Sequence, residues 1–295
     1  MSKISIIIVN YNTKNILKDC LENLKEAKEE FKEDLEIIVV DNSSSDGSAD
    51  LVKENYQDVL LIESENNGLA AAHNLALTRA SGAYFLFMGT DAFPLKEDLI
   101  TLVTYMGKNL DVGLVTPKLV LRDGSLDMDA HRGLPTPWAS FTYFTKLNRL
   151  FPKSKLFNSY FLGYKDFSKP HEIDLCISHF MFVRAKAQQD VGLWDEEFFV
   201  YGEDVDFCYR MKSLGWKIIY LPEVEVLHLK GVSVGTRKES RDLTTASDET
   251  KDRMRKETTR AMKLFYEKHM AQKYPSFINF LVLRGIDSLR VIRRL

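Results

Sequence analysis

The sequence predicts an α/β fold with a mostly parallel central sheet flanked by helices, followed by a helical appendage at the C-terminal end. Two observations predict it. Apolar runs of strand length alternate with helical stretches over the first third of the chain, which is typical of a parallel sheet buried on both faces. From about residue 250 the pattern becomes helical, with a break at Pro275.

The predicted strands of the first third all end in polar side chains. The β-rich runs lie at 4–12, 35–48, 59–68 and 83–93, and the helical stretches lie near 14–30, 48–55, 69–80 and 96–108. In a parallel sheet, ligands bind at the carboxyl ends of the strands. The polar residues that end these runs therefore predict the binding edge of the sheet.

The second half of the chain is less regular. After a β-rich run at 112–125, residues 126–172 are aromatic and loop-rich, and long segments of this kind are usually functional or mobile. Two further β-rich runs, at 173–185 and 217–235, enclose the segment "GLWDEEFFVYGEDVDFCYRM". The length of 295 residues fits one large α/β domain with an appendage.

The charge distribution divides the chain into an acidic body and a basic tail. The formal net charge is -2, but residues 251–295 contain 12 Lys and Arg against 4 Asp and Glu, a local charge of +8 that leaves -10 for residues 1–250. Between 277 and 295 apolar residues recur near helical spacing among arginines, which is typical of a helix in a membrane interface. The alternatives are that this apolar stripe packs on the preceding α/β part of the chain or on a second subunit of a homo-oligomer.

Nothing in the sequence predicts a secreted or membrane-spanning protein. No apolar run approaches the roughly 20 residues that cross a bilayer, and the first residues lead directly into a strand. Cys20, Cys176 and Cys208 lie in apolar surroundings without metal-ligand spacing, so we expect buried thiols. We expect a cytoplasmic protein, peripheral on the inner face of the cell membrane if the tail binds lipid.

The common phosphate-binding loops are absent from the sequence. Neither GxGxxG after the first strand nor GxxxxGK[ST] occurs. A bound nucleotide diphosphate would then need a divalent cation held by a carboxylate to meet its charge. Asp91, in "MGTDAFP" at the end of a predicted buried strand, is placed to bind such a cation. The alternative for Asp91 is a cap on the helix that follows.

Three acidic residues, Glu203, Asp204 and Asp206, follow Gly202 in the aromatic segment "FFVYGEDVDF". Like charges at neighbouring positions repel, and carboxylates near apolar surface lose hydration. The arrangement therefore costs stability unless a cation, a substrate or a helix N-terminus compensates, and this cost indicates a site. The alternative is that the acids only complement the dipole of a helix that starts here.

Taken in order, these segments resemble the family 2 inverting glycosyltransferases, which have a GT-A fold. The resemblance rests on "SIIIVNYN", "IIVVDNSSSDGS", "NNGLAAAHN", the strand ending at Asp91 and the block at 198–235. It covers about residues 4–235 and is closest to the rhamnosyltransferase-like branch, which acts in surface-polysaccharide assembly. It implies a GT-A catalytic domain at 1–240, with a nucleotide-sugar half at about 1–125 and an acceptor half at about 126–240. A basic helical tail at 241–295 follows.

For the donor, the resemblance implies that Asn10 and Tyr11 line the base and ribose pocket. Asp41 is expected to hydrogen-bond the pyrimidine ring, and Asn67 and Gly68 to close over the nucleotide. A carboxylate at a strand end can accept the N3–H of uracil or thymine, and leaving such a buried acceptor unpaired costs about 1–3 kcal/mol. The alternative for Asp41 is a cap on the turn that follows it.

The metal motif departs from the family at one position. Family members commonly carry Asn or Asp two positions before the metal-binding residue, Asp91, and this chain has Gly89 there. His228 matches the family's C-terminal histidine, which in related enzymes approaches the metal or the diphosphate, although a lone histidine is more often structural. The resemblance thus implies Mg²⁺ or Mn²⁺ held by Asp91 and His228 in a thinner shell.

For catalysis, the resemblance assigns the base to Asp204. In an inverting transfer this base deprotonates the acceptor hydroxyl as it attacks the anomeric carbon. Nearby aromatic residues would raise its basicity by desolvation, while the helix start and Arg210 keep neighbouring carboxylates ionised. Glu203 and Asp206 are expected to complement the helix dipole. Trp194 either offers a flat face to an acceptor sugar or is a core aromatic.

The implied function is that of a metal-dependent inverting glycosyltransferase, specifically a hexosyltransferase. It would move a sugar from a dTDP- or UDP-sugar, with L-rhamnose from dTDP-rhamnose expected, to a growing cell-surface polysaccharide or a lipid-linked glycan. The alternative is a catalytically silent nucleotide-sugar-binding scaffold in a polysaccharide-assembly complex. The chain carries no recognisable nucleic-acid-binding module, so we expect no nucleic-acid partner.

Overall fold

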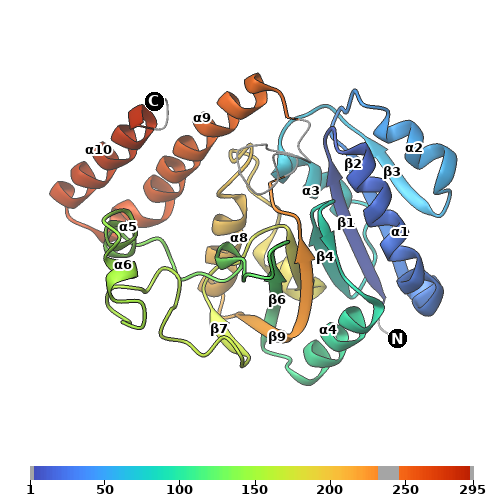
Figure 1. Ribbon diagram of the computed structural model, residues 1–295, viewed down its shortest axis with the longest axis horizontal. Helices are drawn as coiled ribbons and strands as arrows, with labels where there is room; N and C mark the ends of the chain where they lie inside the picture. Colours follow the sequence, from blue (N-terminus) through green and yellow to red (C-terminus); the bar gives the residue numbers. More distant parts are fainter. Residues whose placement is uncertain (1–2, 232–245, 293–295) are drawn as a thin grey trace.

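The centre of the protein is a mixed β-sheet, seen in a computed structural model that describes residues 3–231 and 246–292 (Figure 1). Within these residues the sheet has nine strands in the order β3-β2-β1-β4-β8-β6-β9-β5, with β7 paired to β9. The strands are β1 (Ile4–Asn10), β2 (Leu35–Asp41), β3 (Val59–Glu63), β4 (Tyr84–Met88), β5 (Ala92–Phe93), β6 (Val112–Val120), β7 (His171–Ile173), β8 (Phe180–Arg184) and β9 (Lys217–His228).

Helices lie on both faces of this sheet and beyond its edges. The α-helices are α1 (Lys14–Phe31), α2 (Ser48–Asn55), α3 (Leu69–Leu77), α4 (Lys96–Lys108), α5 (Pro137–Phe144), α6 (Leu147–Leu150), α7 (Ala185–Val191), α8 (Glu203–Ser213), α9 (Asp248–Phe265) and α10 (Ser276–Ile292). The predicted α/β fold with C-terminal helices is therefore confirmed.

The first half of the sheet is parallel, as the alternating pattern predicts. β1 lies between β2 and β4 and pairs with both in parallel, and β2 pairs in parallel with β3. Asn10, the last residue of β1, lies opposite Asp41, the last residue of β2. The polar residues that end these strands thus meet at one edge of the sheet.

The second half is mixed, and one reversed strand decides where the site residues lie. β8 runs antiparallel to its neighbours β4 and β6, so Phe180 at its start pairs with Met88 at the end of β4. The residue before β8, His179, consequently reaches the carboxyl edge of the parallel strands. β9 runs parallel to β6 and ends there too, at His228, which pairs with Ala92 of β5.

Two separate apolar layers hold the helices on the sheet. Because side chains alternate along a strand, Ile6 and Ile8 of β1 face one layer with α1, α2 and α4, while Ile7 faces the other with α3, α7 and α8. Both layers are almost fully buried. The start of α8, with its acidic residues, is therefore fixed to the second face of the sheet.

Residues 126–172, predicted to be loop-rich, contain two short helices. Thr136 caps α5 by accepting a hydrogen bond from the Ala139 amide, and Pro137 occupies the first turn of the helix, where its missing N–H costs nothing. α6 follows after two residues. In Figure 1, α5 and α6 lie at the opposite end of the molecule from α1 and α2.

The C-terminal helices pack on the part of the chain that precedes them. α9 contacts α8, and α10 contacts α9. A small apolar cluster joins them and consists of Phe198, Ala261, Phe265, Tyr266 and Met270. Phe277, Phe280 and Leu281 of α10 stay exposed. None of the helices in the described residues is long and apolar enough to cross a membrane. The first part of the tail therefore packs on the rest of the chain, which was one of the alternatives to a membrane contact. Residues 293–295, at the end of the predicted interfacial helix, lie outside the described residues.

A buried carboxylate anchors the tail to α8. Asp206 accepts hydrogen bonds from Arg210 Nε at 2.7 Å and from His269 Nε2 at 2.6 Å, and His269 belongs to a π-helical turn, Tyr266–Met270, directly after α9. Burial raises the pKa of Asp206, but the His269 hydrogen bond and the Arg210 charge outweigh it and hold the pKa below its ordinary value. Asp206 therefore serves tail attachment as well as the helix dipole.

We predict that Asp206→Asn destabilises the protein by about 3 kcal/mol, because the partly buried Arg210 and His269 lose their anionic partner. Urea unfolding at pH 7 measures the loss. As a matched control, Lys186→Gln removes an exposed ion pair with Asp190 on α7 and should change stability by less than about 0.5 kcal/mol. Equal effects of the two substitutions would contradict the anchoring role.

Candidate active site

The carboxyl edge of the sheet brings together most of the residues that the sequence singled out. β1, β2 and β4 deliver Asn10, Asp41 and Asp91, and β9 delivers His228. α8 begins with Glu203 and Asp204 after Gly202, whose φ of 85° suits glycine. A cluster of buried polar side chains at one sheet edge is the expected form of a ligand site in this fold class.

Asn10 and Asp41 form a buried pair at the centre of this edge. The Asn10 amide donates to Asp41 Oδ2 at 2.8 Å and to Ser44 Oγ at 3.0 Å, while the Ser44 backbone amide donates to Asp41 Oδ1 at 2.8 Å. Asp41 is only 3% exposed. Asp41 therefore both caps the turn after β2 and keeps lone pairs for a ligand, since each carboxylate oxygen has two.

The other predicted nucleotide residues lie around this pair. Tyr11 is half-buried and Asn67 is exposed. Gly68 is buried against the backbone of Phe199, where a Cβ would lie 2.4 Å from the Phe199 carbonyl oxygen, and the Leu69 amide donates to that oxygen at 2.7 Å. The glycine thus lets the loop after β3 pack directly against the segment that leads into α8.

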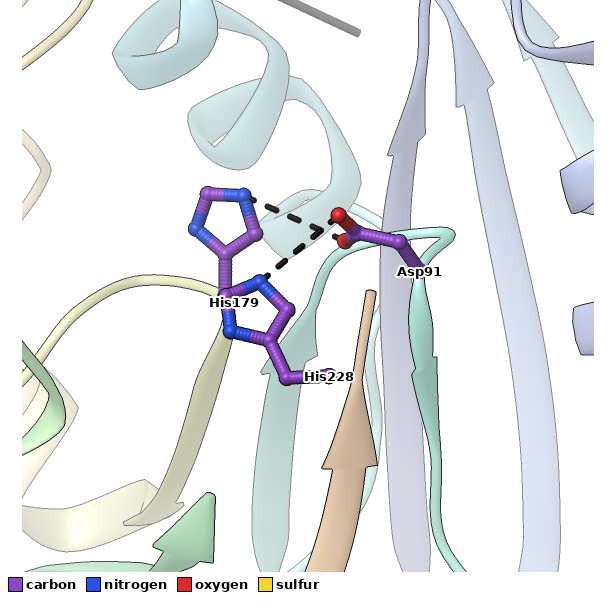
Figure 2. Close-up of side chains that lie close together, drawn as sticks. All are labelled: Asp91, His179 and His228. Atoms are coloured by element: carbon purple, nitrogen blue, oxygen red, sulfur yellow. Dashed lines mark ion pairs between the residues drawn. The ribbon is translucent and has the colours of Figure 1, made fainter. Parts of the chain in front are cut away.

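Asp91 and two histidines form a group that can hold a metal ion (Figure 2). One ligand atom from each of Asp91, His179 and His228 lies within 4.8 Å of the others. His228 Nε2 lies 3.6 Å from Asp91 Oδ2, and His179 Nε2 lies 4.0 Å from Asp91 Oδ1. Figure 2 shows the three side chains converging from three different segments. Asp91 and His228, predicted together as ligands, are therefore neighbours.

The surroundings of His228 prepare it to bind a cation. Its Nδ1 lies 2.9 Å from Asp127 Oδ2, and since a carboxylate only accepts, Nδ1 carries the proton and Nε2 keeps its lone pair. Nε2 is buried and has no hydrogen-bond partner among the described residues. Burial raises the pKa of Asp127, but His228 and Lys230 outweigh it and hold the pKa below its ordinary value. Lys230, which also pairs with Asp129 at 2.7 Å, thus serves Asp127 in this structure.

His179 is the site residue that the sequence reading missed. Gly89 explains its place: a Cβ at position 89 would lie 2.8 Å from His179 Cδ2 and 2.6 Å from Asp91 Oδ1. The missing side chain at the position where the family commonly carries Asn or Asp is therefore the space that the His179 imidazole occupies. A polar His at the start of the apolar run "FMFV" was the available signal, but only strand pairing shows what it faces.

Asp204 sits in a desolvated pocket with one cationic neighbour. Its side chain is 11% exposed, Oδ2 lies 3.5 Å from Arg132 Nη2, and Oδ1 accepts a hydrogen bond from the Val205 amide at 2.8 Å. Burial raises the pKa of Asp204, and Arg132 only partly offsets this rise. Arg132, from the segment before α5, is a second residue that the sequence reading missed.

Glu203 is too deeply buried for its only role to be complementing the helix dipole. It is 3% exposed, Oε1 accepts a hydrogen bond from the Ser178 hydroxyl at 3.1 Å, and Oε2 has no partner among the described residues. Burial, followed by the charge of Asp204, raises the pKa of Glu203 to about 8. Glu203 therefore holds a proton at neutral pH and adds no charge beside Asp204.

Trp194 and Arg210 both have structural roles. Trp194 is 2% exposed and stacks on Phe207 with ring centroids 4.3 Å apart, so it cannot present a face to an acceptor sugar. The expectation of a sugar platform was wrong, and the core alternative holds. Arg210 pairs with Asp206 and donates to the carbonyls of Val191 and Leu193, so it supports α8 and does not contact Asp204 in the described structure.

Comparison with known proteins agrees with this geometry. Glycosyl transferase family 2 matches residues 5–192, more than half of the chain, and Glycosyl transferase family group 2 matches residues 129–266. The chain therefore belongs to glycosyl transferase family 2.

Two curated relatives illustrate the range of the family. The chain is 27% identical over 241 residues to the rhamnosyltransferase WbbL of Escherichia coli K12, covering 76% of this chain and 82% of that protein. It is 37% identical over 112 residues to the poly(ribitol-phosphate) beta-glucosyltransferase of Bacillus spizizenii, covering 36% of this chain but only 18% of that protein. The second relative is thus matched over less than a fifth of its length.

Solved structures share the fold at low sequence identity. The mannosyltransferase PcManGT from Pyrobaculum calidifontis, in complex with GDP-Man and Mn²⁺, aligns with a TM-score of 0.58 at 16% identity, covering 98% of this chain and 70% of that one. Residues 1–349 of S. aureus TarS align with a TM-score of 0.53 at 19% identity, covering 97% and 83%. These likenesses confirm the GT-A fold.

We predict that Glu203→Gln stabilises the protein at pH 8 by on the order of 4 kcal/mol and leaves it nearly unchanged at pH 4.5. The folded state keeps the Glu203 proton up to about pH 8, whereas the unfolded chain releases it near 4.5, so the wild type loses stability as pH rises through this window. Glutamine mimics the protonated acid and removes this loss.

Urea unfolding of both proteins between pH 4.5 and 8 tests this prediction. Glu54→Gln, at an exposed position on α2, is the matched control and should follow the wild type at every pH. A constant stability difference across the range would show that Glu203 is ionised in the folded protein.

Proposed function

We propose that the protein is a metal-dependent inverting glycosyltransferase in which Asp204 is the general base. The observation that carries the proposal is a desolvated carboxylate at the start of α8, at the same sheet edge as the cluster of Asp91, His179 and His228. A base and a cation site on one edge are what an attack on a nucleotide sugar requires. This arrangement supports an enzyme over a silent binding scaffold.

The basicity of Asp204 fits that role. Burial raises its pKa, which makes the carboxylate a stronger base for the acceptor proton, and the Arg132 charge partly offsets this rise. Protonated Glu203 adds no second negative charge beside the attacking hydroxyl. Deprotonation of the acceptor by Asp204 then accompanies departure of the nucleoside diphosphate from the opposite face of the sugar.

The donor is proposed to bind at Asn10, Tyr11, Asp41, Asn67 and Gly68. Asp41, fixed by its neighbours on β1 and in the following turn, offers its remaining lone pairs to the N3–H of a pyrimidine. A dTDP- or UDP-sugar fits this acceptor, and a structural neighbour, S. aureus TarS 1–349, is known in complex with UDP. The rhamnosyltransferases among its relatives favour a rhamnosyl donor, dTDP-rhamnose.

A divalent cation fits the cluster of one carboxylate and two imidazoles. Imidazole nitrogen suits transition metals better than Mg²⁺, so this donor set favours Mn²⁺. Asp91, His179 and His228 would hold the ion, with Asp127 orienting His228. A bound cation would supply positive charge to the diphosphate. Because His179 lies beside Gly89, the proposed metal site has three protein ligands. It is therefore not short of a ligand in the way the sequence suggested.

The acceptor is proposed to be a growing surface polysaccharide or a lipid-linked glycan. One relative, 46% identical over 55 residues, is the N-acetylglucosaminyl-diphospho-decaprenol L-rhamnosyltransferase of Mycobacterium tuberculosis, whose name includes a lipid-linked sugar. Arg132 and Tyr160, which are joined by a hydrogen bond of 3.2 Å beside Asp204, are placed to meet the incoming acceptor.

We predict that Asp204→Asn lowers the rate of dTDP-rhamnose or UDP-sugar cleavage by about 10²- to 10⁴-fold while donor binding persists, because the amide keeps the shape but cannot take a proton. Nucleotide release measures the rate, and thermal shift with dTDP and UDP measures binding. Asp190→Asn, at an exposed position, is the control. Donor binding without any cleavage by the wild type would instead favour the scaffold.

We predict that His179→Ala and His228→Ala each weaken Mn²⁺ binding by at least about tenfold, and that Asp127→Asn, which removes the group that orients His228, weakens it about 10- to 100-fold. Electron paramagnetic resonance of Mn²⁺ gives the affinity independently of turnover. Asp123→Asn, in an exposed turn, should leave binding unchanged. Retained affinity in His179→Ala would remove His179 from the proposed shell.

A further inference from the structure

The segment that contains α5 and α6 exposes an unusual number of apolar side chains. Of the seventeen exposed large apolar residues among the described parts of the chain, seven lie between positions 138 and 156. We call these seven the α5–α6 surface: Trp138, Phe141, Tyr143, Phe144, Leu150, Phe151 and Leu156. Two leucines are the most exposed of them, Leu150 at 71% and Leu156 at 59%.

Internal contacts hold this surface in shape. Trp138 Nε1 donates to the Leu156 carbonyl at 2.9 Å, which closes the segment on itself. The Trp138 ring stacks beside Phe141 at a centroid distance of 5.6 Å, and the rings of Phe151 and Phe157 lie 4.9 Å apart. The exposed rings are therefore arranged before any partner arrives.

Positive charge surrounds the exposed rings without compensation. Residues 133–165 contain five Lys and Arg and no Asp or Glu, although the whole chain has a net charge of -2. Lys146, Arg149, Lys153 and Lys155 are all exposed. None of the four forms an ion pair within the described residues, whereas exposed lysines such as Lys25, Lys53 and Lys186 each pair with a carboxylate.

We propose that the α5–α6 surface docks on an anionic phospholipid bilayer. Trp, Tyr and Phe are favoured at the interface of a membrane, exposed leucines can enter the acyl boundary, and each nearby Lys or Arg gains from anionic headgroups. A second copy of the chain fits less well, because a two-fold interface would place these uncompensated cations against one another. A nucleic acid or glycan would leave Leu150 and Leu156 without an apolar partner.

A chain of contacts links the docking surface to Asp204, the proposed base. Tyr143 of α5 contacts Tyr160 with ring centroids 5.3 Å apart, Tyr160 accepts a hydrogen bond from Arg132, and Arg132 pairs with Asp204. Gly133, next to Arg132, packs so closely that a Cβ would lie 2.3 Å from the Ser159 carbonyl oxygen. Docking through α5 and α6 would therefore hold the start of α8 at a fixed short distance from the membrane surface.

Flotation of the full-length protein with lipid vesicles tests the proposal. The protein is expected to float with vesicles of equal parts phosphatidylcholine and phosphatidylglycerol, and not with phosphatidylcholine alone. Lys153→Gln combined with Lys155→Gln should weaken binding by roughly tenfold to thirtyfold. Trp138→Ala combined with Phe141→Ala should weaken it by at least about tenfold.

Matched controls separate this surface from the rest of the molecule. Lys108→Gln with Lys186→Gln removes two exposed cations elsewhere, and Leu110→Ala with Leu214→Ala removes two exposed leucines that are 72% and 55% exposed. Both control proteins should float as the wild type does. The Lys153 and Lys155 variant should also cleave donor in solution at the wild-type rate, so failure of membrane docking is distinguishable from failure of the proposed catalysis.

Three results would overturn the proposal. One is a wild-type protein that does not float with the anionic vesicles at low salt. Another is binding that survives in the Lys153 and Lys155 variant but is lost in Phe277→Ala with Phe280→Ala, which would assign docking to the exposed face of α10. The third is a dimer in sedimentation equilibrium that Trp138→Ala with Phe141→Ala dissociates, which would assign the surface to a second copy.

Discussion

Compensation of buried carboxylate charge is the constraint on which this site depends. Asp127 is held ionised by His228 and Lys230, and Asp206 by Arg210 and His269. Among the described residues, Asp204 forms one ion pair, with Arg132 at 3.5 Å. The pKa of Glu203 is raised to about 8, so Glu203 is protonated at neutral pH. The degree of compensation thus separates Asp127 and Asp206, which stay ionised and hold the structure together, from Glu203 and Asp204 at the head of α8, whose pKa values are raised.

The same constraint links catalysis to architecture. α8 carries both Asp204 and Asp206 in its first turn, and Asp206 binds the π-helical turn after α9. The tail is therefore fixed to the helix that presents the proposed base. Figure 1 shows α9 beside α8 on the side of the sheet away from α1, which fits a tail that braces α8.

The local sequence pattern was enough to predict the fold class, but it did not predict the order of the strands in the sheet. Alternating apolar runs and helices identified the parallel strands, and the polar ends of those strands located Asn10, Asp41 and Asp91. His179, Asp127 and Arg132 were missed because their roles arise from contacts across 88, 101 and 72 residues of chain, to Asp91, His228 and Asp204 respectively. Trp194 could not be assigned from sequence, because an aromatic ring for a sugar and one for the core look alike until burial is known.

Gly89 has a consequence for how this site can change over time. A side chain at 89 and an imidazole at 179 compete for the same space, so neither position is free to change alone. Replacing Gly89 by an acidic residue without shrinking residue 179 would produce a clash, and losing His179 first would leave the cluster one donor short. The two positions form an epistatic pair, and any path between this arrangement and one with an acid at 89 must pass through an intermediate that is either crowded or short of a ligand.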